Sequence, residues 1–147
     1  DAQAAPMVKQ MKRLGLKAKL MGGDMLNTPT FIQLAGADAA GHYSAVAGGV
    51  LSARPAGKAF ERRYKARFHQ DVVLLGPQFY DGVMLVAAAM KQAGSVEPAK
   101  YLPKLAAIRY SGVTADFAFA PNGNLLKAPV TLSTVKNNAW AVETVVR

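Results

Sequence analysis

The stretch that decides the fold is Leu20-Met21-Gly22-Gly23-Asp24, an apolar run that stops at two glycines and is followed by a carboxylate. Such a run predicts the carboxyl end of a strand, where glycine lets the backbone come close to a ligand. Open α/β sheets bind small molecules at the carboxyl ends of their strands. Asp24 is therefore the first candidate binding residue, and burial of its charge would require a cationic partner.

The neighbouring segments predict the elements of an α/β unit. Apolar residues recur at helical spacing before Gly15 and predict an amphipathic helix, after which Leu16 to Met21 predicts a buried strand. Thr28-Pro29 predicts the capped start of a short helix. Gly41 to Ala47 predicts a further strand. Helix, glycine, strand and acid together form half of a βαβ unit.

The middle of the chain predicts a crossover followed by helices. Gly48-Gly49 is typical of a crossover, because glycine tolerates the dihedral changes of a hinge. Helices are predicted from about Ala56 to Phe68 and from about Pro77 to Ala93, and the second should be the most buried helix. A weaker helical stretch follows, which Pro103 should bend or divide.

The C-terminal part predicts strands joined by turns. Val113 to Phe119 alternates apolar and polar residues, and Pro121-Asn122-Gly123-Asn124 is a turn by its chemistry. Leu125 to Val135 and Ala139 to Val146 should form strands on either side of a turn at Lys136-Asn137-Asn138. This order predicts an α/β protein with a predominantly parallel sheet and an antiparallel C-terminal edge.

The net charge of +9 over 147 residues makes nucleic-acid binding an alternative function. On the helix from about Ala56 to Phe68, however, Phe60, Tyr64 and Phe68 recur every four residues. They predict a buried aromatic stripe with the basic residues on the solvated side. Neither exposed aromatics interleaved with the charge nor a known recognition motif is visible, so we expect no nucleic-acid partner.

The sequence gives little support to an enzyme. There is no cysteine, and His42 and His69 have no acidic residue at ligand spacing, so no metal site is expected. No glycine-rich phosphate loop follows a strand, and no serine has a nucleophile-elbow context. The aspartates include no two at a spacing that fixes a catalytic pair. The longest apolar run, Gly82 to Met90, is too short to span a bilayer.

Several stretches carry a resemblance to one known family: 1–6, 15–24, 35–41, 78–83 and 117–125. In these the chain resembles the periplasmic solute-binding proteins of branched-chain amino-acid ABC transporters, and the resemblance runs through its whole length. It implies a type I periplasmic-binding-protein-like α/β fold, mostly a parallel sheet with helices on both faces and antiparallel C-terminal hairpin strands. Members are two-lobed and more than twice as long, so this chain looks like a C-terminal portion, an incomplete two-lobe fold.

The resemblance also implies how the chain is divided. Residues 1–47 are expected to be part of the C-terminal lobe, 48–131 part of the N-terminal lobe, and 132–147 a return to the C-terminal lobe. Because each lobe would lack strands, apolar faces and edges should be exposed. We therefore expect a strand-exchanged homo-oligomer or a companion N-terminal fragment.

The function implied by the resemblance is capture of an amino acid or similar small acid between two lobes, and delivery to a membrane permease in the periplasm. It needs no cofactor. Asp24 would pair with the ligand's ammonium, while Leu75 and Tyr80 would contact the ligand from the other lobe. Asp24 could instead be a turn residue, and Leu75 and Tyr80 could be core residues. A ligand-sensing regulatory module of the same fold is the alternative function.

Overall fold

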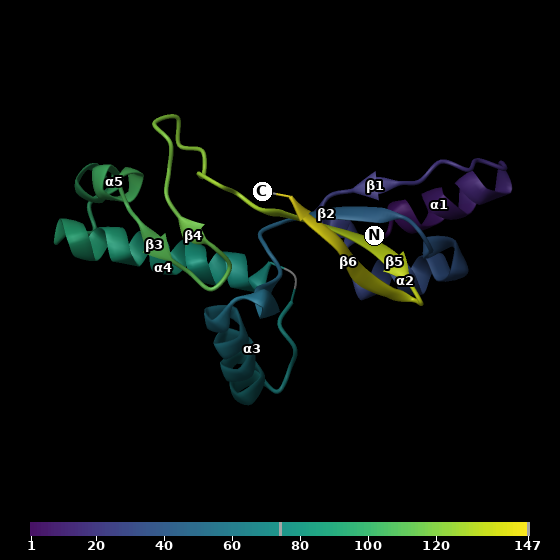
Figure 1. Ribbon diagram of the computed structural model, residues 1–147, viewed down its shortest axis with the longest axis horizontal. Coiled ribbons are helices and arrows are strands. Elements are labelled where there is room, and N and C mark those ends of the chain that lie inside the picture. Colours follow the sequence, from purple (N-terminus) through teal and green to yellow (C-terminus); the bar gives the residue numbers. More distant parts are fainter. Residues whose placement is uncertain (74, 147) are drawn as a thin grey trace. The chain divides into compact units, whose positions relative to one another are not determined.

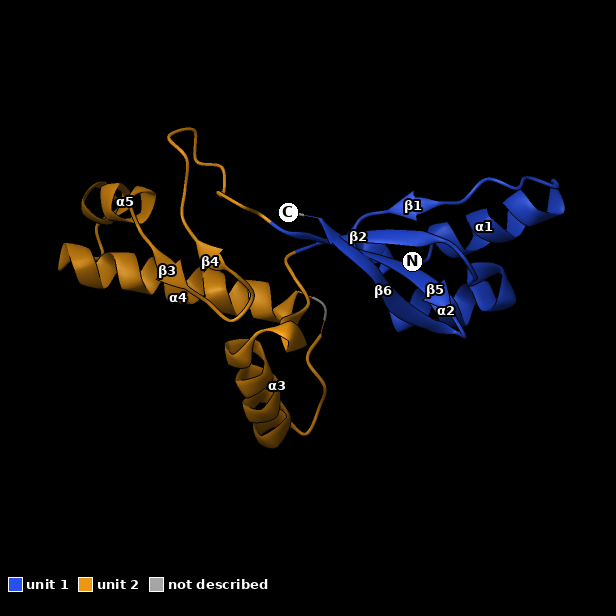
Figure 2. Ribbon diagram, in the orientation of Figure 1, with its two compact units in different colours: residues 1–47, 129–147 blue, residues 48–128 orange. Residues whose placement is uncertain are grey.

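The computed structural model describes residues 1–73 and 75–146 of the chain. It divides into two compact units, one made of residues 1–47 and 129–147 and the other of residues 48–128 (Figure 2). We call them unit 1 and unit 2 and describe each by itself.

Unit 1 is a mixed four-stranded sheet with helices packed on it (Figure 1). The strand order is β1-β2-β5-β6, with β1 parallel to β2 and the other two pairs antiparallel. The predicted α/β class and the antiparallel C-terminal hairpin are confirmed. The elements are α1 (Ala4–Arg13), β1 (Met21–Gly22), the 3-10 helix η1 (Asp24–Leu26), α2 (Pro29–Ala35), the 3-10 helix η2 (Gly36–Ala39), β2 (Tyr43–Ala47), β5 (Val130–Lys136) and β6 (Ala139–Val146).

The core of unit 1 lies between these helices and the sheet. Val8 of α1, Phe31 of α2 and Val135 of β5 are at most 3% exposed and belong to one apolar cluster. Trp140 of β6 stacks on Phe31 with 5.8 Å between ring centroids. Its indole N–H donates to the carbonyl of Thr28 at 3.1 Å, which fixes the start of α2 against β6. This core holds β1 and β2 in place.

The strand predicted from Leu16 to Met21 is wrong in extent, because β1 covers only Met21–Gly22. At Leu20 the backbone N–H donates to Nδ1 of His42 at 2.9 Å, so a side chain replaces a ladder bond. Within the described residues β1 pairs with β2 alone. Leu16 and Met21 are consequently more than half exposed instead of buried.

The hairpin of β5 and β6 follows its predicted turn. Asn137 and Asn138 both have positive φ, 52° and 56°, as a two-residue type I′ turn requires. The strand predicted from Leu125 begins only at Val130, because Leu125 instead forms an isolated bridge with Phe119. The turn at residues 121–124 is present.

Unit 2 is mostly helical, with a two-stranded sheet of β3 and β4. Its core contains Leu85, Ala89 and Ile108. Its elements are the 3-10 helix η3 (Leu51–Ala53), α3 (Pro55–Phe68), α4 (Gly76–Ala93), α5 (Pro98–Ala106), β3 (Tyr110–Ser111) and β4 (Asp116–Phe117). Pro103 does not divide α5, which continues through it as one helix.

Of two burial predictions for unit 2, one is wrong and the other holds only in part. The aromatic stripe of α3 is buried only at Phe60, 8% exposed, whereas Phe68 is 56% exposed. The helix α4 has four buried residues, more than any other helix in the described residues, but not all of its apolar residues are covered. Phe79 and Val83 are about 70% exposed, and the buried residue between them is Asp81. In the described residues, therefore, the apolar composition of these two helices does not predict which of their side chains are buried.

None of the helices in residues 1–73 and 75–146 is long and apolar enough to cross a membrane.

Candidate functional site

The carboxyl end of β1 presents Asp24 on a tightly fixed turn. Buried Ser44 of β2 donates its hydroxyl to the carbonyl of Gly23 at 3.1 Å, which ties the turn to the neighbouring strand. A Cβ added to Gly22 would lie 2.8 Å from Cδ2 of Leu26, so glycine lets η1 fold back onto β1. Asp24 is then the first residue of η1.

Asp24 is half-buried, and one oxygen of its carboxylate can still accept a hydrogen bond from a ligand. Oδ1 accepts the N–H of Met25 at 2.9 Å, which is a turn contact. Within the described residues Oδ2 has no hydrogen bond and Asp24 has no ion pair. A ligand ammonium would therefore meet a negative charge that no side chain of the described part of this chain neutralises.

Leu75 and Tyr80 lie together at the start of α4 in unit 2. Leu75 is the N-cap residue of that helix and is half-buried. Tyr80 is 37% exposed, and its ring lies 4.9 Å from the ring of Phe60 on α3. Leu75 and Tyr80 thus belong to one segment of unit 2, whereas Asp24 belongs to unit 1.

Sequence reasoning missed the role of Asp81, the neighbour of Tyr80. Asp81 is fully buried, and its carboxylate accepts the N–H of Val113 at 2.8 Å and two hydrogen bonds from Thr114. A Cβ on Gly112 would lie 2.6 Å from that carboxylate. The sequence feature that could have predicted this contact is an acidic residue within a mostly apolar helix, together with a distant Gly-Val-Thr segment that could supply hydrogen-bond donors. Asp81 fixes the loop that joins β3 to β4 onto α4.

A second polar cluster in unit 2 joins Arg54 to the β3–β4 pair. Arg54 donates to Asp116 at 2.8 Å, and the hydroxyl of Ser111 donates to the same carboxylate at 2.6 Å. These two hydrogen bonds, that of Arg54 first, lower the pKa of Asp116 below its usual value. The cluster ties the start of α3 to the small sheet.

Metal ligands do not gather in the described part of the chain, where no three His, Cys, Asp or Glu side chains form a group that could hold an ion. What the carboxyl end of β1 offers chemically is a fixed carboxylate that can bind a cation.

The fold of this chain is similar to that of several solved substrate-binding proteins. The leucine-binding protein of Thermotoga maritima has a TM-score of 0.86 and 23% identity over 99% of this chain and 42% of its own. The branched-chain amino acid transporter substrate-binding protein of Streptococcus pneumoniae, solved with isoleucine, has a TM-score of 0.76 and 27% identity over 97% of this chain and 40% of its own. A substrate-binding protein of Desulfitobacterium hafniense, solved with Leu, has a TM-score of 0.74 and 18% identity, over 95% of this chain and 39% of its own.

The chain therefore spans about two-fifths of the length of the solved structures that it matches. No curated protein matches it by sequence. The family model described as periplasmic binding protein matches residues 1–139, nearly the whole chain. This chain belongs to the periplasmic binding protein family.

Proposed function

We propose that this chain is part of the substrate-binding component of an ABC transporter, which binds a branched-chain or related amino acid between two lobes and delivers it to a membrane permease. The family and the relatives that were solved with isoleucine and leucine support this proposal. In the same proposal the protein acts in the periplasm, residues 1–47 and 132–147 are part of the C-terminal lobe, and residues 48–131 are part of the N-terminal lobe.

The observation that carries the proposal is the carboxylate of Asp24 at the carboxyl end of β1, which has no ion pair within the described residues. Closing a second lobe over a carboxylate removes water from it, which costs several kcal/mol unless a cation is there to meet it. The α-ammonium of an amino acid is such a cation, whereas a neutral isostere is not. Asp24 thus selects ligands that carry an amine.

The remaining ligand contacts are proposed for α4. Leu75 would contact the apolar side chain of the ligand, and Tyr80 would add a ring and a hydroxyl. Binding closes the two lobes by hinge motion, and the closed form docks on the permease. The chain by itself retains too few of the ligand's hydrogen-bond partners to bind with micromolar affinity.

The test is calorimetry on a protein that contains this sequence within a complete two-lobed fold. Leucine and isoleucine are compared with 4-methylpentanoate, which has the leucine skeleton without the amine. Asp24→Ala should weaken amino-acid binding at least about tenfold, the loss of one desolvated charge contact. Asp71→Ala is the matched control, because Asp71 is 85% exposed and pairs only with Lys65 in the described residues.

Unchanged leucine affinity in Asp24→Ala, with the protein folded, would refute the role of Asp24. Binding of 4-methylpentanoate as tightly as leucine would refute recognition of the ammonium. If neither leucine nor isoleucine binds the parent protein, the proposed class of ligand is wrong.

A further inference from the structure

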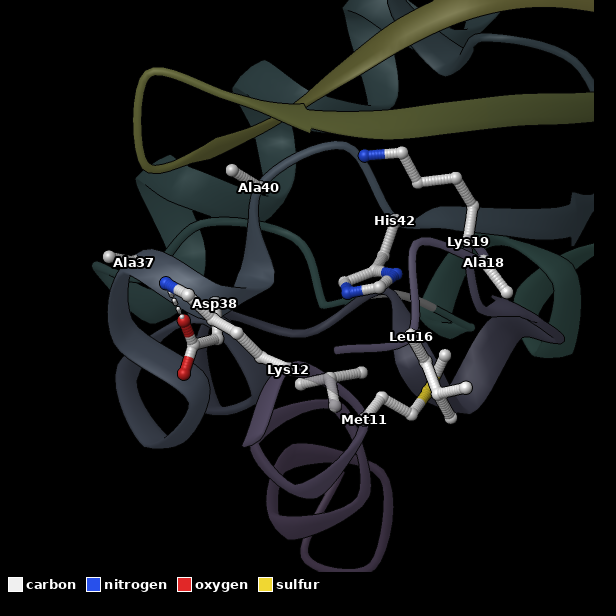
Figure 3. A pocket seen from close by; sticks show the side chains of 10 residues that line it. Met11, Lys12, Leu16, Ala18, Lys19, Ala37, Asp38, Ala40 and His42 are labelled. Atoms are coloured by element: carbon white, nitrogen blue, oxygen red, sulfur yellow. Dashed lines mark hydrogen bonds and ion pairs between the residues drawn. The ribbon is translucent and has the colours of Figure 1, made fainter. Parts of the chain in front are cut away.

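Unit 1 contains a hollow of about 220 Å³ (Figure 3). It is lined by α1, η2, the segment before β1 and the residue before β2. Because β1 and β2 run parallel, residues that precede both strands lie at their amino ends. Asp24 follows β1, so this hollow is separate from the candidate amino-acid site.

Six of the ten residues that line the hollow are apolar. Val8 and Met11 from α1 and Leu16 from the segment before β1 supply the large side chains, and Ala18, Ala37 and Ala40 leave the space between them. Val8 is 2% exposed and so belongs to the floor, while Leu16 is 53% exposed and belongs to the rim. A short aliphatic chain would gain apolar contact there without displacing any side chain.

The polar groups of the hollow divide into two sets, which lie on either side of His42 in Figure 3. On one side Lys12 is paired with Asp38 at 2.7 Å. On the other side lies Lys19, which has no ion pair within the described residues. Lys19 is therefore the cation available to a ligand, since Asp38 already neutralises Lys12.

The Nδ1 atom of His42 is not available to a ligand. His42 is 7% exposed, and its Nδ1 accepts the N–H of Leu20. Burial, and then the charge of Lys19, lower the pKa of His42, whereas Asp38 opposes the shift. The imidazole is thus neutral near pH 7, and it serves as a flat wall between the two polar sets.

We propose that this hollow binds a short-chain aliphatic carboxylate, with the hydrocarbon chain on Val8, Met11 and Leu16 and the carboxylate at Nζ of Lys19. One available ammonium beside an apolar surface suits a single negative charge with a hydrocarbon tail. An inorganic phosphate would need several donors and gains nothing from the apolar lining. An alkylamine would meet a net positive charge, because two lysines and one aspartate line the hollow.

The test is a titration of the ¹⁵N-labelled chain with hexanoate at pH 7, followed by amide chemical shifts. Hexanoate should shift the amides of Leu16, Ala18, Lys19 and Ala40 saturably, with a Kd of about 10 mM or lower, as its few atoms allow. Acetate, at the same concentrations, should give no saturable shifts at these positions, and hexanol and hexylamine should bind at least about threefold to fivefold more weakly than hexanoate. Asp24→Ala should leave hexanoate binding unchanged, which separates this site from the proposed function.

Variants then assign the contacts. Lys19→Gln should weaken hexanoate about threefold to fivefold, as loss of an exposed charge pair predicts. Lys17→Gln is the matched control, because it removes the same charge two residues away and does not line the hollow. Leu16→Ala should weaken hexanoate without creating acetate binding.

Absence of saturable shifts up to 50 mM hexanoate, in a sample whose amide spectrum is dispersed, would overturn the proposal. Equal shifts with hexanol, or equal losses in Lys17→Gln and Lys19→Gln, would overturn the recognition of the carboxylate by Lys19. Retention of full hexanoate affinity in both Lys19→Gln and Leu16→Ala would place the ligand elsewhere and overturn the site.

Discussion

Asp81 and Thr114 are 33 residues apart, yet Oδ2 of Asp81 accepts both the N–H of Thr114 at 2.7 Å and its hydroxyl at 2.6 Å. Both residues are buried. Together with the N–H of Val113, these donors satisfy a carboxylate that lies on a mostly apolar helix. The pair anchors the β3–β4 loop of unit 2 to α4, next to the proposed ligand contact Tyr80.

Asp81→Asn should destabilise the protein by about 2–3 kcal/mol, because an amide nitrogen would replace one of two acceptors and leave buried donors unmatched. Urea unfolding followed by circular dichroism measures the change. Asp71→Asn, at an exposed carboxylate, should change stability by no more than about 0.5 kcal/mol. An equally small effect for Asp81→Asn would show that the buried hydrogen bonds do not contribute to stability.

Gly112→Ala tests the same anchor from the loop side. A Cβ there would lie 2.6 Å from three atoms of the Asp81 carboxyl group, so the loop must move away from its acceptor. We expect a loss of about 1–3 kcal/mol, typical of overpacking. The control is Gly23→Ala, where a Cβ meets no atom within 4 Å and φ is −78°. Equal unfolding midpoints for the two variants would contradict the predicted clash.

Local chemistry predicted the parts of this fold whose stabilising contacts are close in sequence. Thr28-Pro29 does cap α2, with the Thr28 hydroxyl accepting the N–H of Phe31, and the Asn137-Asn138 turn does set the final hairpin. The assignment to the α/β class followed from the order of the predicted helices and strands, and the family from a resemblance in residues 1–6, 15–24, 35–41, 78–83 and 117–125.

Burial was less predictable, because it depends on which neighbours are present. Phe79 and Val83 are apolar but exposed, while Asp81 is buried because Val113 and Thr114, far along the chain, supply donors. The spacing of apolar residues predicts which side chains share one face of a helix. It does not predict whether another part of the chain packs against that face. The position of Asp24 after β1 was predictable from Gly22-Gly23, and its pairing with a ligand amine remains a proposal.

Stability should depend on pH through His42. Burial, then Lys19, lower its pKa in the folded protein below 6.5, although Asp38 acts in the opposite direction. The unfolded chain therefore binds more protons in this range, and stability is present above about pH 6.5 and is lost as the pH falls through 6.5 toward the lower folded value. Urea midpoints at pH 7.5, 6.5 and 5.5 should fall in that order.

The matched variant is His42→Asn, whose Oδ1 can accept the N–H of Leu20 in place of Nδ1 without gaining a proton. It should remove most of the decline between pH 7.5 and 5.5. His69→Gln, at an exposed position, should retain the decline. A parent-like decline in His42→Asn would assign the pH dependence to other groups. The depressed pKa of Asp116 acts only at more acidic pH, below the ordinary carboxyl value.

Thr28→Ala should destabilise the protein by about 1 kcal/mol, because α2 loses the hydroxyl that accepts the N–H of Phe31 at 3.0 Å. Thr28→Ser keeps that acceptor and should recover most of the loss. Trp140 donates to the backbone carbonyl of Thr28, a contact that both variants retain, so tryptophan fluorescence in the folded state should not change. If both variants lose the same stability, the methyl group of Thr28 is responsible and the cap is not.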